Sequence, residues 1–113
     1  MHEYSIIQAL LDQCENIAYE NNATKIEKIQ IKIGVMSGVE PHLLSVSFDT
    51  FKEDTLCSEA TLEIIHQPLI IECQECKHTE TLTEIKYTCT KCDSSNIKVI
   101  DGEDMYLMKV EMS

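Results

Sequence analysis

The sequence of 113 residues predicts an α+β fold, in which a small domain with two helices and a mixed sheet carries an inserted zinc-ribbon module. Three observations predict this fold. Helical spacing of apolar residues near the start of the chain gives way to alternation around Ile31, and helical spacing returns after Pro41. Two C-x-x-C pairs follow. Alternation of apolar residues then closes the chain.

The first helix is predicted over residues 4–22. Its apolar residues recur at the three- and four-residue spacing of an amphipathic helix: Ile6, Ile7, Leu10, Leu11, Cys14, Ile17 and Ala18. Ser5 and Gln8 suit a capping box, although the helix could begin a residue or two earlier, and Asn21-Asn22 should end the helix.

A strand and a second helix are predicted next. Three isoleucines alternate with polar residues over 29–33, which predicts a half-buried strand that ends at Gly34. The second helix should cover 41–53, with Pro41 in its first turn. Its apolar face repeats at helical spacing through Leu44, Phe48 and Phe51.

Shorter strands complete the predicted fold. They are expected over 62–66, 97–99 and 106–112, and Leu69 and Ile71 lead into the first cysteine pair. Between the cysteine pairs, residues 77–88 are Thr-rich around Leu82 and Ile85, which predicts a short hairpin. We expect residues 1–68 plus 102–113 to form an α/β domain and residues 69–101 to form the zinc ribbon. The last strand should return to the sheet of the first domain.

The charge of the chain limits its partners. Twenty acidic residues face nine basic ones, all lysines, so the net charge is −11. Such a surface repels phosphate backbones and suits a basic protein partner or a metal cation. We expect neither nucleic acid nor membrane as a partner. The first residues lack the pattern of a signal peptide, so we expect a cytoplasmic location.

Four cysteines in two tight pairs, Cys73/Cys76 and Cys89/Cys92, predict a tetrahedral structural zinc site that is closed to substrate. His78 stands two residues after the first pair, where it could be an alternative ligand or could hydrogen-bond to one.

The other two cysteines are expected to be ordinary thiols. Cys14 should be a small core residue on the apolar face of the first helix. Cys57 should be a free, partly buried thiol.

Two alternatives share the four-cysteine pattern. One is a zinc-ribbon module that only binds another protein or nucleic acid, although no basic stripe or aromatic platform supports nucleic-acid binding. The other is an iron site of the rubredoxin type. An enzyme is the weakest interpretation, because no nucleophile-base pair stands out and a Cys₄ zinc site has no open position.

The sequence Met1-His2-Glu3 suggests a second metal site. The free amine, the peptide nitrogen of His2 and its imidazole could close two fused chelate rings on one cation. The peptide nitrogen of Glu3 could supply a fourth ligand. Four nitrogens in a plane suit Ni(II) or Cu(II).

Taken together, these motifs closely resemble those of the HypA/HybF family of hydrogenase maturation nickel metallochaperones. The resemblance covers nearly the whole chain. It is carried by Met1-His2-Glu3, Ile33-Gly34, Ser37-Gly38-Val39-Glu40, Leu44, Phe48, Asp49, both cysteine pairs, Gly102-Glu103 and the terminal strand ending in Glu111.

The resemblance implies a non-enzymatic carrier. In that family the N-terminal histidine, here His2, is a nickel ligand, the acidic residue after it, here Glu3, supports the site, and the four cysteines bind structural zinc. Glu40 is expected near the nickel. Zn(II) would be a structural cofactor and Ni(II) the transferred cargo.

The implied partners are a HypB-type nickel-binding GTPase and the hydrogenase large subunit, with urease maturation proteins for some members. The chain itself would be a monomer or a homodimer. One departure concerns the zinc site. Several relatives carry a histidine after each cysteine pair, but here Asp93-Ser94 follows the second pair. A rearrangement that needs two histidines is therefore not expected.

Overall fold

The computed structural model describes residues 2–84 and 86–113, apart from the side chain of His2. These residues form two compact units. The helical unit comprises Met1–Lys32, Val39–Ile65 and Tyr106–Ser113, and the cysteine unit comprises Ile33–Gly38 and His66–Met105. The cysteine unit thus takes in more of the chain than the predicted ribbon at 69–101.

The first helix, α1 (His2–Glu20), begins two residues before the predicted start. Its buried residues share one face: Ile7, Leu10, Leu11, Cys14 and Ala18. Asn22 has a φ of 56°, and the N–H of Ala23 donates to the carbonyl of Ala18 at 2.8 Å. This closing turn satisfies carbonyls that the helix itself leaves without partners, which confirms Asn21-Asn22 as its end. The capping box is wrong, because Ser5 lies inside the helix.

The second helix, α2 (Pro41–Phe51), starts at the predicted residue and ends two residues early. Glu40 caps it, since its Oε2 accepts the N–H of Leu43 at 2.8 Å. Pro41 occupies the first turn, where its missing N–H costs no hydrogen bond. Leu44 and Phe48 face the core.

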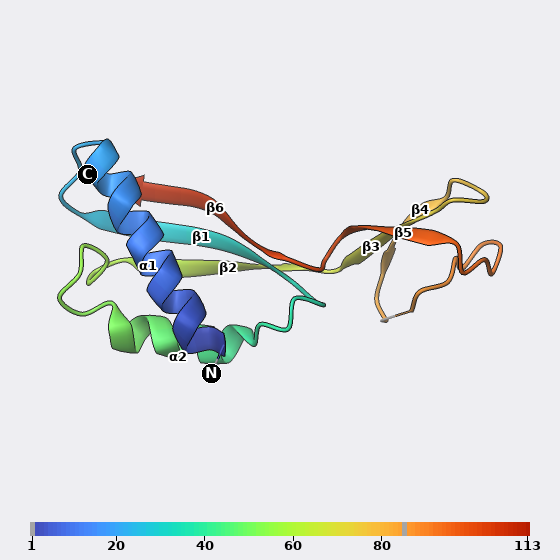
Figure 1. Ribbon diagram of the computed structural model, residues 1–113, viewed down its shortest axis with the longest axis horizontal. Coiled ribbons are helices and arrows are strands. Elements are labelled where there is room, and N and C mark those ends of the chain that lie inside the picture. Colours follow the sequence, from blue (N-terminus) through green and yellow to red (C-terminus); the bar gives the residue numbers. More distant parts are fainter. Residues whose placement is uncertain (1, 85) are drawn as a thin grey trace. The chain divides into compact units, whose positions relative to one another are not determined.

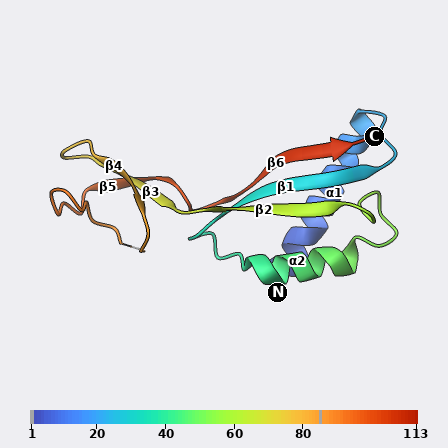
Figure 2. The ribbon, with the colours of Figure 1, turned by 180° about the vertical axis from the view of Figure 1, so that it is seen from behind.

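The sheet of the helical unit has the order β2-β1-β6. It consists of β1 (Ile26–Gly34), β2 (Thr61–Gln67) and β6 (Met105–Met112). In Figure 1, β1 and β2 run one way and β6 runs the other, so the sheet is mixed as predicted. Both ribbon views show α1 crossing one face of this sheet (Figures 1 and 2). The return of the last strand to the first sheet is confirmed.

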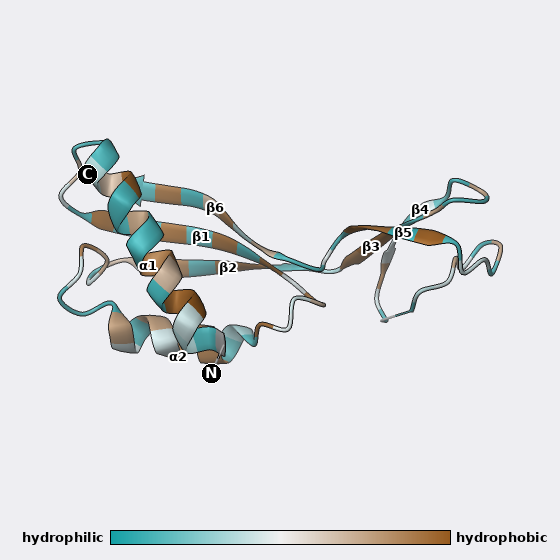
Figure 3. Cartoon of the chain, in the orientation of Figure 1, coloured by the Kyte–Doolittle hydropathy of each residue, from teal (hydrophilic) through white to brown (hydrophobic). Residues whose placement is uncertain are grey.

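The central strand β1 anchors this core. Its buried residues are Ile26, Ile29, Ile31 and Ile33, and hydropathy alternates along the strand in Figure 3. Cys14 is buried as predicted. Cys57 is also completely buried, so the prediction of partial burial was wrong.

The cysteine unit has an antiparallel sheet of order β4-β3-β5. It consists of β3 (Leu69–Cys73), β4 (Thr79–Leu82) and β5 (Ile97–Asp101). The hairpin predicted within 77–88 is wrong, because β4 pairs back onto β3 and the first cysteine pair forms the turn. The prediction for Ile85 lies outside the described residues. The buried core of this unit is small, with Leu69, Ile71 and Leu82 packed against Ile97 and Val99.

Among the described residues, no helix is both long and apolar enough to cross a bilayer.

Candidate metal centre

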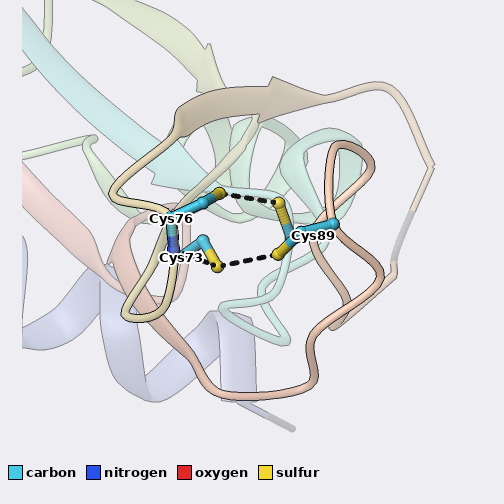
Figure 4. Close-up of side chains that lie close together, drawn as sticks. Cys73, Cys76 and Cys89 are labelled. Carbon is cyan, nitrogen blue, oxygen red and sulfur yellow. Dashed lines mark hydrogen bonds between the residues drawn. The ribbon is translucent and has the colours of Figure 1, made fainter.

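The two cysteine pairs meet in the cysteine unit and form one cluster (Figure 4). The four sulfurs all lie within 4.8 Å of one another. The Sγ atoms of Cys73 and Cys92 are 3.5 Å apart, and those of Cys76 and Cys89 are 3.7 Å apart. These separations are far longer than a disulfide bond of about 2.0 Å.

The sulfur positions fit a tetrahedral metal ion. Four thiolates at a zinc–sulfur distance of about 2.3 Å must lie about 3.8 Å from one another. The Cys73–Cys92 and Cys76–Cys89 sulfur separations, 3.5 and 3.7 Å, are close to that value. Within the described part of the chain, this is the one group of metal-ligating side chains that converges on a common point.

The local backbone explains why the sulfurs converge. We call residues 73–78 the first knuckle and residues 89–94 the second knuckle. In the first, the N–H of Cys73 donates to the carbonyl of His78 at 2.8 Å, and the N–H of Lys77 donates to that of Cys73 at 3.0 Å. Lys77 has a φ of 62°, which turns the chain sharply after the second cysteine.

The second knuckle repeats this pattern position for position. The N–H of Cys89 donates to the carbonyl of Ser94 at 2.9 Å, and the N–H of Asp93 donates to that of Cys89 at 2.9 Å. Asp93 takes a φ of 60°. The two knuckles therefore present their cysteines from equivalent backbone turns, and Asp93-Ser94 does not disturb that turn.

Backbone N–H groups point at the sulfurs. The N–H of Cys76 donates to the Sγ of Cys73 at 3.4 Å, and the N–H of Lys91 donates to that of Cys89 at 3.3 Å. The N–H of Cys76 lowers the pKa of Cys73 to about 7. Such donors stabilise thiolates, which are the form that binds a metal ion.

The four thiols do not ionise equally. The pKa of Cys92 is raised to about 12: the N–H of Ser94 acts to lower it, but the thiol of Cys73, burial and the other two thiols outweigh that effect. The cluster therefore resists carrying four negative charges by itself. A dication at its centre would relieve this repulsion, so the chemistry of the donor set fits Zn(II).

His78 lies beside the cluster. Its Nε2 is 3.9 Å from the Oε2 of Glu80, and the group of converging ligand atoms contains the four sulfurs without His78. Glu80 itself binds Thr90 of the second knuckle through two hydrogen bonds. These bonds hold the pKa of Glu80 below its usual range, and the bond from the Thr90 hydroxyl contributes most. Sequence reasoning missed this contact, because no spacing rule links residues ten positions apart.

The proposed nickel residues are only partly visible. Met1 and the side chain of His2 lie outside the described residues. The backbone of His2 opens α1, and the Oε2 of Glu3 accepts the N–H of Glu40 at 3.2 Å. The structure thus brings Glu3 together with the cap of α2, the residue that the sequence placed near the same site.

Comparisons with known proteins agree with this architecture. The family model described as "Hydrogenase/urease nickel incorporation, metallochaperone, hypA" matches residues 1–112. A "Hydrogenase maturation factor HypA" of Shewanella baltica (strain OS185) is 54% identical over 112 residues, which are 99% of this chain and 96% of that protein. The protein of the same name from Aquifex aeolicus is 44% identical, with 99% and 97% covered.

Solved structures match the fold as well. The solution structure of the Ni metallochaperone HypA from Helicobacter pylori gives a TM-score of 0.71 at 35% identity, and it covers 97% of this chain and 96% of that one. A second structure, titled "Solution structure of HypA protein", gives a TM-score of 0.77 at 36% identity, with 100% and 97% covered. The chain belongs to the HypA family of metallochaperones.

Proposed function

We propose that this chain is a nickel metallochaperone that delivers Ni(II) to the [NiFe]-hydrogenase active site during maturation. The observation that carries this proposal is the family match over residues 1–112, which includes the motif Met1-His2-Glu3. Hydrogenase is the proposed recipient because the relatives are named for its maturation. The family description also names urease, so urease is the second proposed recipient of the nickel.

We propose that nickel binds at the start of α1. The ligands would be the amine of Met1, the backbone nitrogen and imidazole of His2, and a nitrogen or carboxylate of Glu3. The first N–H groups of a helix have no partner within it, so ligation by these nitrogens breaks no helical hydrogen bond. The positive end of the helix opposes a cation, and the carboxylate of Glu3 offsets that effect. Glu40, whose N–H donates to the carboxylate of Glu3, would connect the site to the start of α2.

We propose that Cys73, Cys76, Cys89 and Cys92 hold one structural Zn(II). The sulfur separations and the matched backbone turns support this assignment. The small core of the cysteine unit supports it further, because a unit of this size is usually stabilised by a metal or a disulfide. When bound, zinc would supply folding free energy and no catalytic step.

The proposed partners are a HypB-type nickel-binding GTPase and the hydrogenase large subunit, in the cytoplasm. A separate GTPase is required for any coupling to hydrolysis, because the sequence lacks a phosphate-binding loop of the G-x-x-x-x-G-K-[ST] type.

The test of the nickel site is a titration of zinc-loaded protein with Ni(II), followed by calorimetry and by the visible d–d band. Wild-type protein should bind one Ni(II) in a planar, low-spin, yellow complex. Both His2→Ala and an N-terminal extension should abolish this binding without loss of zinc. His42→Ala is the matched control, since His42 is an exposed histidine on α2. Nickel binding that survives both changes at the N-terminus would place the site elsewhere.

A further inference from the structure

Two side-chain contacts join the knuckles to each other. Glu80 binds Thr90, and Asn96 binds Glu75. In each contact, one residue lies four positions after the second cysteine of its own pair, and its partner lies inside the other knuckle. The repeat of the knuckle backbone is thus matched by a repeat of the contacts between the knuckles. We call the first contact the Glu80 clasp and the second the Asn96 clasp.

The Glu80 clasp has the better geometry of the two. One carboxylate oxygen accepts the backbone N–H of Thr90 at 3.0 Å, and the other accepts its hydroxyl at 2.5 Å. Both bonds are charge-assisted. Because the two carboxylate oxygens of Glu80 bind the same residue, they fix the orientation of Thr90 as well as its distance. The side chain of Glu80 is only 16% exposed, whereas its partner Thr90 is exposed, so water reaches these bonds from the side of Thr90.

The anchor of this clasp belongs to the sheet. Glu80 lies on β4 and pairs with Ile71 of the central strand β3, and Ile71 is a core residue of the cysteine unit. The second knuckle, by contrast, follows residues 83–88, of which those described form no helix or strand. The backbone hydrogen bonds described within the knuckle fold it internally, and its connection to the sheet is the short segment that leads into β5.

The Asn96 clasp is weaker. The Nδ2 of Asn96 donates to the Oε1 of Glu75 at 3.1 Å, and its carbonyl accepts the N–H of Gln74 at 2.9 Å. Asn96 and Glu75 are both exposed, so solvent competes for the side-chain bond.

We infer that Glu80 is a positioning residue of the four-cysteine site, which holds the second knuckle at metal-binding distance and thereby slows the loss of the metal. This inference rests on the proposed zinc site. Without the clasp, the second knuckle would stay joined to the sheet through the metal, the short connection to β5 and the weaker Asn96 contacts. The second knuckle would then open more often, and a competing chelator would reach the sulfurs sooner.

The test measures zinc release from the full chain to an excess of a colorimetric chelator. Glu80→Ala removes both clasp bonds, and Thr90→Val removes the hydroxyl bond alone. We expect release about 10-fold faster for Glu80→Ala, at the low end of what partners of metal ligands contribute, and an intermediate rate for Thr90→Val. Thr90→Ser keeps the hydroxyl and should release zinc at the wild-type rate. Glu84→Ala removes an exposed carboxylate of the same segment and is the matched control.

A second measurement separates positioning from general destabilisation. Each variant is loaded with Co(II), whose thiolate charge-transfer and d–d bands report tetrahedral sulfur ligation. Unchanged bands together with faster zinc release support the inference. If Glu80→Ala does not fold, the comparison of Thr90→Val with Thr90→Ser carries the same test.

Two results would overturn the inference. Zinc-loaded Glu80→Ala and Thr90→Val that both release the metal at the wild-type rate would show that the clasp has no positioning role, while the zinc site itself would stand. Wild-type protein that contains no zinc and gives no cobalt–thiolate bands would overturn the proposed site, and the clasp with it.

Discussion

Cys14 and Cys57 are chemically distinct from the four clustered cysteines. Both are fully buried in the helical unit. Burial raises the pKa of Cys14 to about 12, with a further contribution from Cys57, and it raises that of Cys57 to about 11, with a further contribution from Glu15. Because the thiolate is the reactive form, these two thiols should be inert in the folded protein and reactive only after it unfolds.

The same shifts predict how stability depends on pH. The two thiols ionise near pH 9.0 when unperturbed but only near pH 11 to 12 in the fold. Their contribution to the free energy of unfolding is thus fully present below about pH 9 and declines as the pH rises toward 12. Urea unfolding at a series of alkaline pH values should show the decline.

A double variant isolates this effect from other groups that titrate at high pH. Cys14→Ala combined with Cys57→Ala should be less stable at neutral pH, because it leaves cavities, but its stability should fall less steeply above pH 9. Identical slopes for the two proteins would contradict the assignment.

At the scale of elements, the backbone at the end of β1 packs directly against the backbone of Gly102 and Glu103. A Cβ on Gly34 would lie 2.4 Å from the carbonyl carbon and oxygen of Gly102, and 2.9 Å from the nitrogen of Glu103. None of these atoms belongs to a flexible side chain. Glycine is therefore required at this position by lack of space.

Gly34→Ala should lower the free energy of unfolding of the chain by about 1–3 kcal/mol, the usual cost of forcing extra atoms into a packed site. Urea denaturation is the measurement. Val35→Ala is a suitable control, because Val35 is 56% exposed and its truncation should change stability by less than about 0.5 kcal/mol. Equal stability of the two variants would show that the strand end can separate without cost.

Much of this element structure was predictable from apolar periodicity. The helices and the central strand β1 each have a buried face whose apolar spacing is visible in the sequence. The terminal strand was located by alternation as well, although Tyr106 and Met108 are exposed. The hairpin between the cysteine pairs was predicted wrongly, because the tight knuckle at Lys77 serves as the turn that joins β3 to β4. A four-residue strand with a single buried side chain, Leu82, carries too little pattern to identify its partner.

The candidate site, like the elements, could be predicted from the sequence only in part. The cysteine spacing predicted the cluster, because each pair needs only local backbone to place two sulfurs together. The Glu80 clasp and the contact between Glu3 and Glu40 depend on how distant segments meet, which no local pattern encodes.

At the scale of the whole molecule, the two units should respond differently to loss of zinc. Replacing Cys73 or Cys89 with Ala should unfold residues 69–101, because structural zinc supplies folding free energy on the order of 10 kcal/mol. The helical unit has its own buried core and should persist. Amide hydrogen exchange would show protection lost in the first region and kept in α1 and β1.

Elemental analysis is the companion measurement. It should find one zinc per wild-type chain and none in these variants. Iron in place of zinc, or loss of protection throughout α1, would contradict the prediction.

The net charge of −11 bears on partner association. Asp12 and Glu20 are exposed on α1, where they can steer a basic GTPase surface. Glu15 is half-buried on the same helix, and its Oε2 accepts the N–H of Leu56 at 3.3 Å. Its carboxylate adds to the acidic surface of α1.

The association rate with a HypB-type partner should fall as salt rises, because exposed charges are screened within about 10 Å at 0.1 M salt. Stopped-flow binding at low and high salt measures this. Asp12→Asn with Glu20→Gln should weaken the salt dependence, whereas Lys109→Gln, an exposed change of the opposite sign, should not. A rate that is constant across the salt series would argue against steering.

The close approach at Gly102 also has an evolutionary consequence. Gly102 lies so near Pro68 and Leu69 that a Cβ there would be 2.8 Å from the backbone of each. The N–H of Val35 donates to the carbonyl of Gln67, and the N–H of Met36 donates to that of Gly102, so one segment binds both flanks of this junction. The two ends of the stretch from Leu69 to Gly102 therefore lie next to each other. Insertions, deletions or exchange of the knuckles within it should therefore leave the register on either side unchanged, so we expect this stretch to tolerate changes of length and sequence.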